Sequence, residues 1–148
     1  MIAAILTGRD DELPFVLLDG DKVGKSAMRD LRDDLYQGRP ERVLDVSAYS
    51  GIEDGEIEDL IPRDIMVQAI DRLFRASEVD DEFVNFAGPG AIVPQIRNWA
   101  AKVGVALPKD YKVQLAKRVK QTLLSTKASD IGDETFAVWV KIFDAFAV

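Results

Sequence analysis

The sequence predicts an α/β fold in which a small parallel sheet is flanked by helices and the C-terminal half is mainly helical. Three observations predict it: an apolar run at 15–18 that stops at two aspartates, a second strand-like run at 43–46 that contains one aspartate, and apolar residues at helical spacing between them. A strand, a helix and a strand over this distance are typical of a parallel βαβ unit. Beyond residue 62, apolar residues recur mostly at helical spacing.

Capping and turn residues predict where these elements begin and end. Ser26 is a suitable cap for a helix over about 26–37, which Gly38 and Pro40 end. The second strand is expected to extend toward Tyr49. The other expected elements are the end of a helix at 1–8, a helical turn at 58–61, a helix at 63–76, a short strand at 82–86, and helices at 93–103, 110–125 and 133–146. We expect a single domain over residues 1–148, with the metal-site βαβ part in 1–62 and a mainly helical part in 63–148.

The composition narrows the chemistry that the chain can perform. Its 148 residues include no cysteine and no histidine, so disulfides, thiolate metal sites and histidine bases are excluded. Any metal ion must be held by oxygen, which suits Mg²⁺ or Mn²⁺. No apolar run approaches the length of a membrane span, and the apolar start at 1–6 lacks the basic residues of a secretory signal. We therefore expect a soluble cytoplasmic protein with no membrane partner.

The net charge of −7 is unevenly distributed along the chain. Residues 1–96 hold 10 basic and 21 acidic side chains, whereas residues 97–127 hold 8 basic side chains and one acidic side chain. An acidic half that holds cations beside a basic segment that contacts phosphates would suit a nucleic-acid substrate. A lysine-rich helix face exposed to water is the alternative interpretation.

Asp19 and Asp21 are the strongest candidates for a functional site. They follow the predicted strand directly and are separated only by Gly20, so both carboxylates reach the edge of the sheet. Two carboxylates this close repel each other unless a cation lies between them. The sequence therefore indicates a divalent-metal site that acts on phosphates. The alternative is a turn in which the two aspartates accept hydrogen bonds from backbone N–H groups.

Two further segments supply candidate residues. In the acidic segment at 51–62, Glu58 and Asp59 stand between apolar residues that anchor a turn, so their carboxylates can be preorganised toward a second cation. Lys112 lies at the start of the predicted helix 110–125, where a lysine opposes the helix dipole. Near a metal centre it could neutralise charge that develops on a phosphate during hydrolysis. A solvated lysine is the alternative.

Four segments occur in a recognisable order along nearly the whole chain. They are LLDGDKVGK at 17–25, EIEDLIP at 56–62, KVQLAK at 112–117 and WVKIF at 139–143. In this order they resemble a Toprim domain, and specifically the C-terminal nuclease half of the OLD-family (overcoming lysogenization defect) ATP-dependent endonucleases. The resemblance implies a Toprim-like fold and DNA phosphodiester hydrolysis with two Mg²⁺ or Mn²⁺ ions.

The same resemblance implies roles for individual residues. Asp19 and Asp21 match the family's metal-binding pair, and an acid of 56–59 would help bind the second ion, with Glu58 favoured over Asp59 and Glu56. Lys112 matches the catalytic lysine, with Lys117 as the second choice.

Two parts of the family pattern have no counterpart: the ATPase half, and the first strand with its metal-binding glutamate. The only glutamate before the aspartate pair is Glu12, which lies in a predicted loop. We therefore expect a partial Toprim domain whose partners include DNA, an ATPase or nuclease chain that supplies the missing parts, and a further copy of itself.

Two other functions remain open at this stage. The chain could be a non-catalytic interaction subunit, or a remnant of such a nuclease that keeps the fold and docks on a partner. It could also be a phosphatase of the haloacid-dehalogenase type, which likewise carries two aspartates after a strand. The phosphatase is disfavoured because Val23 stands where that family's pattern has threonine.

Overall fold

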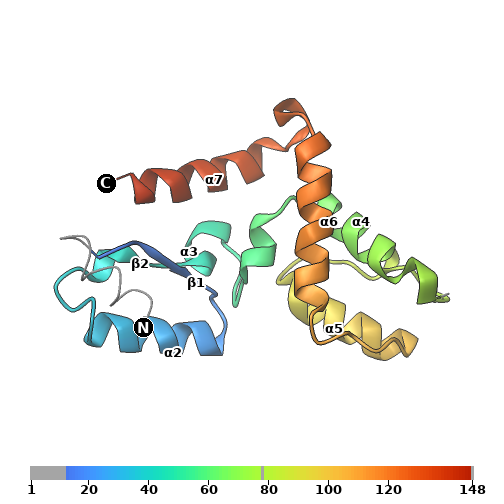
Figure 1. The fold of residues 1–148 in the computed structure, drawn as a ribbon, viewed down its shortest axis with the longest axis horizontal. Coiled ribbons are helices and arrows are strands. Elements are labelled where there is room, and N and C mark those ends of the chain that lie inside the picture. The colour runs from blue at the N-terminus through green and yellow to red at the C-terminus, as the bar shows by residue number, and fades with distance from the viewer. Residues whose placement is uncertain (1–12, 78, 148) are drawn as a thin grey trace.

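A computed structural model describes residues 13–77 and 79–147 of the chain. The two strands and α2 lie toward one end of an elongated molecule, and α4, α5 and α6 gather toward the other (Figure 1). The last helix, α7, returns across the strands. The predicted helix end at 1–8 lies outside the described residues.

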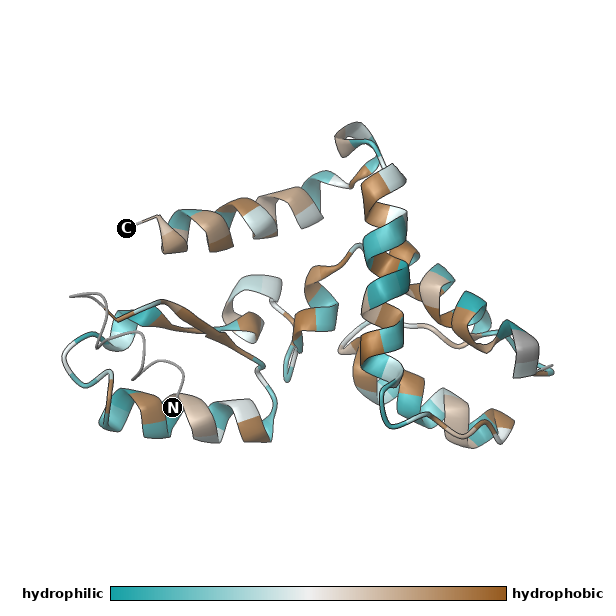
Figure 2. Ribbon diagram, in the orientation of Figure 1, coloured by the Kyte–Doolittle hydropathy of each residue, from teal (hydrophilic) through white to brown (hydrophobic). Residues whose placement is uncertain are grey.

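A two-stranded parallel sheet forms the N-terminal part. β1 (Val16–Leu18) pairs with β2 (Val43–Asp45), and α2 (Lys22–Asp33) connects them. Both strands are largely hydrophobic along their length (Figure 2), because they pack with α2 around a small buried cluster of Met28, Tyr36 and Val43, the last of which belongs to β2. The predicted α/β class with a small parallel sheet is confirmed.

Two boundaries near the sheet differ from the prediction. α2 begins at Lys22 rather than at Ser26, because the Asp21 side chain caps the helix by accepting a hydrogen bond from the Gly24 N–H over 2.7 Å. β2 does not extend toward Tyr49. It stops at Asp45, which caps the short helix α3 (Val46–Ser50).

The predicted strand at 82–86 is wrong. This segment forms a 3₁₀ helix, η4 (Phe83–Asn85). Asp71 of α4 accepts hydrogen bonds from the backbone N–H groups of Phe83 (2.6 Å) and Val84 (3.3 Å), which a strand would have used for pairing. Burial raises the pKa of Asp71, and these two hydrogen bonds offset part of that effect.

The C-terminal part is helical, as predicted. The 3₁₀ turn η2 (Ile57–Leu60) is followed by α4 (Arg63–Phe74), α5 (Ile92–Val103), α6 (Tyr111–Ser125) and α7 (Asp133–Phe146). This part also contains the 3₁₀ turns η3 (Arg75–Ser77) and η5 (Ala128–Asp130), while η1 (Pro40–Arg42) precedes β2. None of the helices in the described residues is both long and apolar enough to cross a lipid bilayer.

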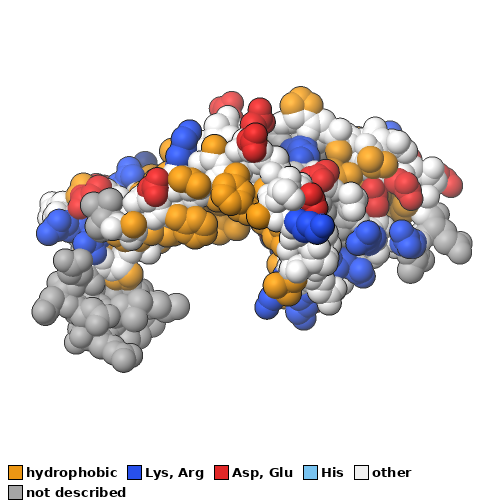
Figure 3. All heavy atoms as spheres, turned by 90° about the horizontal axis from the view of Figure 1, so that it is seen from above, with side chains coloured by type: hydrophobic (Ala, Val, Ile, Leu, Met, Phe, Trp, Pro, Cys, Tyr) orange, Lys and Arg blue, Asp and Glu red, His pale blue; other side chains and the backbone are white. Residues whose placement is uncertain are grey.

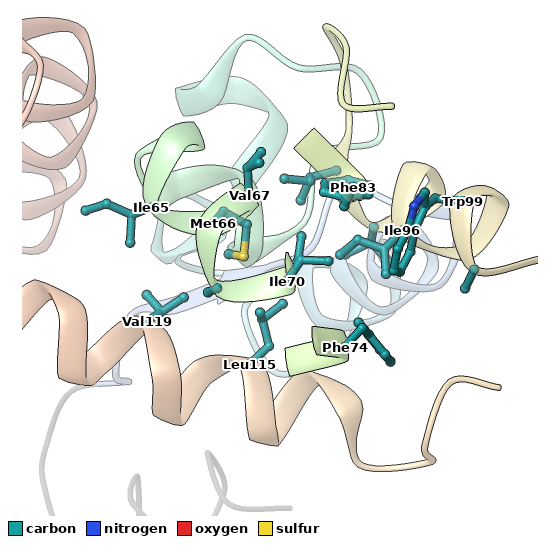
Figure 4. Close-up of a cluster of buried hydrophobic side chains, with 14 residues drawn as sticks. Ile65, Met66, Val67, Ile70, Phe74, Phe83, Ile96, Trp99, Leu115 and Val119 are labelled. Carbon is teal, nitrogen blue, oxygen red and sulfur yellow. The ribbon is translucent and has the colours of Figure 1, made fainter. Parts of the chain in front are cut away.

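The main hydrophobic core lies between α4, α5 and α6 (Figure 4). Trp99 of α5 is fully buried, makes edge-to-face contacts with Phe74 and Phe83, and donates its indole N–H to the carbonyl of Asp81 over 2.9 Å. Leu115 of α6 is also buried in this core. The core therefore fixes α6, the helix that carries Lys112.

α7 connects the helical part to the sheet. The indole N–H of Trp139 donates to the carbonyl of Leu60 in η2 over 2.7 Å. Near its C-terminal end, Phe146 packs against Phe15, with 5.7 Å between ring centroids. Elsewhere on α7, the side chains of Phe136 and Phe143 are exposed.

Replacing Gly24 by alanine is expected to lower the free energy of unfolding by about 2–3 kcal/mol, since overpacking forces backbone shifts. An added Cβ would lie 1.9 Å from the carbonyl oxygen of Asp19. The matched control is Gly38→Ala, because no atom lies within 4 Å of its added Cβ. Urea unfolding followed by circular dichroism measures both variants. Equal midpoints would contradict this account of the turn between β1 and α2.

Candidate functional site

Three aspartates lie at one edge of the sheet. β1 leads directly into Asp19 and Asp21, and β2 ends at Asp45, which pairs with the last residue of β1. Gly20 permits this close approach, because a Cβ there would lie 1.7 Å from Ser47 Oγ and 2.9 Å from Asp45 Oδ1. Ligands of open α/β sheets bind at the carboxyl ends of the strands, which is this edge.

The acidic segment lies across this edge and is held there by hydrogen bonds. The Gly20 N–H donates to the carbonyl of Gly55 over 2.7 Å, and the Gly55 N–H donates to Ser47 Oγ over 3.1 Å. The Ile57 N–H donates to Asp19 Oδ1 over 2.9 Å. Asp19 therefore links the sheet edge to η2, the turn that carries the second group of predicted acids.

Lys112 lies in the first turn of α6 and contacts the 3₁₀ turn η2 and the residue before it. Its ammonium forms one ion pair with Glu56 and a second, at 3.1 Å, with Oε1 of Glu58. Among residues 13–77 and 79–147, Glu56 is the only polar or charged residue that is buried. A buried carboxylate requires a compensating cation, and Lys112 supplies it.

The two glutamates change the protonation behaviour of Lys112. Partial burial acts to lower the pKa of Lys112, but the hydrogen bonds and charges of Glu56 and Glu58 outweigh burial and raise the pKa above its ordinary value. Lys112 is therefore a fixed positive charge at neutral pH. In that state it can act as an electrostatic group but not as a general base.

Asp59 is used differently from its neighbours. Its Oδ2 accepts a hydrogen bond from the Glu56 N–H over 2.9 Å, and its Oδ1 accepts one from the Ile92 N–H over 2.8 Å. The first bond forms part of a capping box that shapes η2. The second ties η2 to the start of α5. Because both oxygens are occupied by backbone groups, we assign Asp59 to holding Glu56 and Glu58 in position.

Asp21 and Asp45 each use one oxygen as a helix cap. Asp21 Oδ1 accepts the Gly24 N–H, and Asp45 Oδ1 accepts the Ser47 N–H over 2.8 Å. No hydrogen bond from the described residues reaches Oδ2 of Asp21, of Asp45 or of Asp19. Sequence reasoning singled out the pair after β1 but missed Asp45. The available signal was that Asp45 lies at the carboxyl end of β2, the strand parallel to β1. The carboxyl ends of neighbouring parallel strands meet at the same edge of the sheet.

The donor atoms suit a hard divalent cation. In the described ranges, no group of three or more acidic residues gathers into a ready-made ligand set. Mg²⁺ commonly binds through one or two carboxylates and completes its shell with water and substrate phosphates. One carboxylate oxygen each of Asp19 and Asp21 accepts no hydrogen bond from the described residues and could serve in this way, and Glu58 lies on the turn to which Asp19 is bonded.

Comparisons with family models, with curated proteins and with solved structures gave no match to this chain.

Proposed function

We propose that this chain is a Toprim-type nuclease module, similar to that of the OLD-family endonucleases, which hydrolyses DNA phosphodiesters with Mg²⁺ or Mn²⁺. The observation that supports this most is the contact of Lys112 with Glu56, across 56 residues of sequence, and with Glu58. Segments that resemble the family in sequence thus lie together in space, next to the aspartates at the sheet edge.

The proposed roles follow from position and charge. Two divalent ions held by Asp19, Asp21 and Glu58 would supply an activated water and stabilise the leaving oxygen of the phosphodiester. Lys112 would neutralise charge that develops on the phosphate. Because Glu58 contacts the Lys112 ammonium, a cation bound at Glu58 competes with that ion pair. The other basic residues of α6 would attract the DNA backbone.

A non-catalytic interaction subunit is the second candidate. The observation that favours it is that Lys112 already forms ion pairs with both glutamates, so each of these carboxylates has a cationic partner that is not a metal ion. Under this alternative, the Glu56–Lys112 contact serves only to join η2 to α6. The exposed apolar side chains of α7 would then serve a docking function.

Nicking of supercoiled plasmid separates these functions. The nuclease proposal expects nicked circles with Mg²⁺ or Mn²⁺ and none with EDTA, while a small phosphomonoester is not hydrolysed. Intact plasmid under all conditions, with a folded chain by circular dichroism, would contradict the nuclease and favour the interaction subunit. Metal-dependent hydrolysis of the phosphomonoester alone would instead support the phosphatase.

A further inference from the structure

The first two turns of α2 carry a basic stripe. Residues 22–29 contain Lys22, Lys25 and Arg29 and no acidic residue, and all three basic side chains are exposed. Because helix positions three and four residues apart are neighbours, these cations share one face with the hydroxyl of Ser26. The four side chains line a surface pocket of about 340 Å³, and among the described residues Asp54 is the only other one in its lining.

The charges that line this pocket do not balance. Asp54 has a left-handed backbone conformation (φ 53°), and its Oδ1 lies 2.5 Å from Nζ of Lys25, which holds that lysine at the rim of the pocket. Lys22 and Arg29 form no ion pair with any described residue, and the Ser26 hydroxyl makes no hydrogen bond with one. The lining therefore offers two unpaired cations and a free hydroxyl, a donor set that suits phosphate oxygens.

The pocket lies beside the candidate site. Lys22 follows Asp21 directly, and Asp54 precedes Gly55, whose carbonyl accepts the Gly20 N–H at the sheet edge. The opposite side of the sheet has a different character. Figure 1 shows the strands between α2 and α7, and Figure 3, which views the molecule from the side of α7, shows hydrophobic side chains gathered there. A polyanion at the sheet edge therefore finds its nearest unpaired cations on the α2 side.

We propose that this pocket binds the phosphodiester backbone of a DNA strand whose neighbouring phosphate lies at the candidate site. The assignment rests on the proposed function, because the carboxylate edge is what places a phosphate next to the pocket. Residues 22–29 span about 10 Å of helix axis, so the stripe reaches more than one phosphate of a strand, which recur about every 3.4 Å along a duplex axis. Lys22, Arg29 and Ser26 contact phosphate oxygens, which fixes the position of the strand without reading its bases.

Fluorescence anisotropy with a labelled DNA duplex in EDTA tests this contact, since no metal ion then takes part. Lys22→Gln/Arg29→Gln removes the two unpaired charges at exposed positions, so the variant is expected to fold, which circular dichroism checks. Its affinity should fall at least about tenfold at low salt, and its dependence of log K on log salt concentration should lose about 2 from the slope, about one for each phosphate contact. The matched control, Arg72→Gln/Arg97→Gln, removes two exposed arginines from α4 and α5 at the other end of the molecule and should bind as the wild type does.

Two binding results overturn the proposal: a Lys22→Gln/Arg29→Gln variant that equals the control in affinity and salt slope, and a wild type that binds no DNA in EDTA. Inorganic phosphate at constant ionic strength should leave the DNA bound. Its displacement of DNA from the wild type alone would assign the pocket to a free phosphate and also overturn the proposal. Plasmid nicking separates this contact from the proposed function. Binding through α2 without nicking contradicts the nuclease and supports the contact, whereas nicking with unchanged binding in the variant contradicts the contact alone.

Discussion

Lys112→Met is expected to lower the free energy of unfolding by about 2–4 kcal/mol, because removing one partner of a buried ion pair leaves the other charge unpaired. The buried residue is Glu56, whose side chain is 8% exposed, whereas that of Lys112 is 34% exposed. Partial exposure of Lys112 places the expected loss toward the lower end of that range. Chemical denaturation at neutral pH measures it.

Two variants identify the cause of that loss. Lys117→Met removes an exposed lysine from the same helix and is expected to change stability by less than about 0.5 kcal/mol. The double variant Glu56→Gln/Lys112→Met removes both charges and should recover most of the lost stability. A double variant as unstable as Lys112→Met would show that the lysine stabilises the fold through packing and not through its charge.

The stability of the wild type is also expected to fall at alkaline pH. The pKa of Lys112 in the folded chain lies above its ordinary value of 10.5, so the stabilisation is present below that value and is lost as the pH rises through the folded-state pKa. Burial also raises the pKa of Tyr36, which adds a loss in the same direction. Lys112→Met keeps the tyrosine effect and that of Lys25, whose pKa is raised by its hydrogen bond with Asp54. Its stability should therefore fall less steeply above pH 10.5, and parallel curves would contradict the assignment.

Asp19→Asn is expected to reduce metal-dependent DNA cleavage by at least about 100-fold, since even residues that only support metal ligands cost 10–100-fold when replaced. Asparagine retains an oxygen that can accept the Ile57 N–H, so the link to η2 is kept while the charge is lost. Plasmid nicking rates measure the effect, and thermal unfolding checks the fold. Asp30→Asn, at an exposed position of α2, is the matched control. Equal loss in both variants would remove Asp19 from the proposed site.

The helices and strands could be predicted wherever the local sequence pattern determines them. The helices after residue 62 follow from apolar residues at helical spacing, and the two strands from short apolar runs. The start of α2 was not predictable, because both Asp21 and Ser26 are good caps. Asp21 is used because Gly24 packs against the Asp19 carbonyl, a contact that only glycine permits. This choice depends on the turn in three dimensions and not on cap preference.

Contacts over long sequence separations explain the remaining differences. The 3₁₀ helix η4 depends on Asp71, which is 12 residues from Phe83, and no local pattern at 82–86 reveals that partner. Residue spacing alone likewise says nothing of the contact between Lys112 and Glu56. Lys112 and the acids were singled out separately, and only folding of α6 against η2 joins them. The burial of Glu56 could therefore not be predicted from the sequence either.

Titration of the wild type and Asp19→Asn with Mn²⁺ in a calorimeter tests the central claim most directly. The claim is that the carboxylates at the sheet edge bind a divalent cation. We predict saturable heat of binding for the wild type and its loss in the variant, with both chains equally folded. Identical isotherms, or no binding to the wild type, would contradict the account.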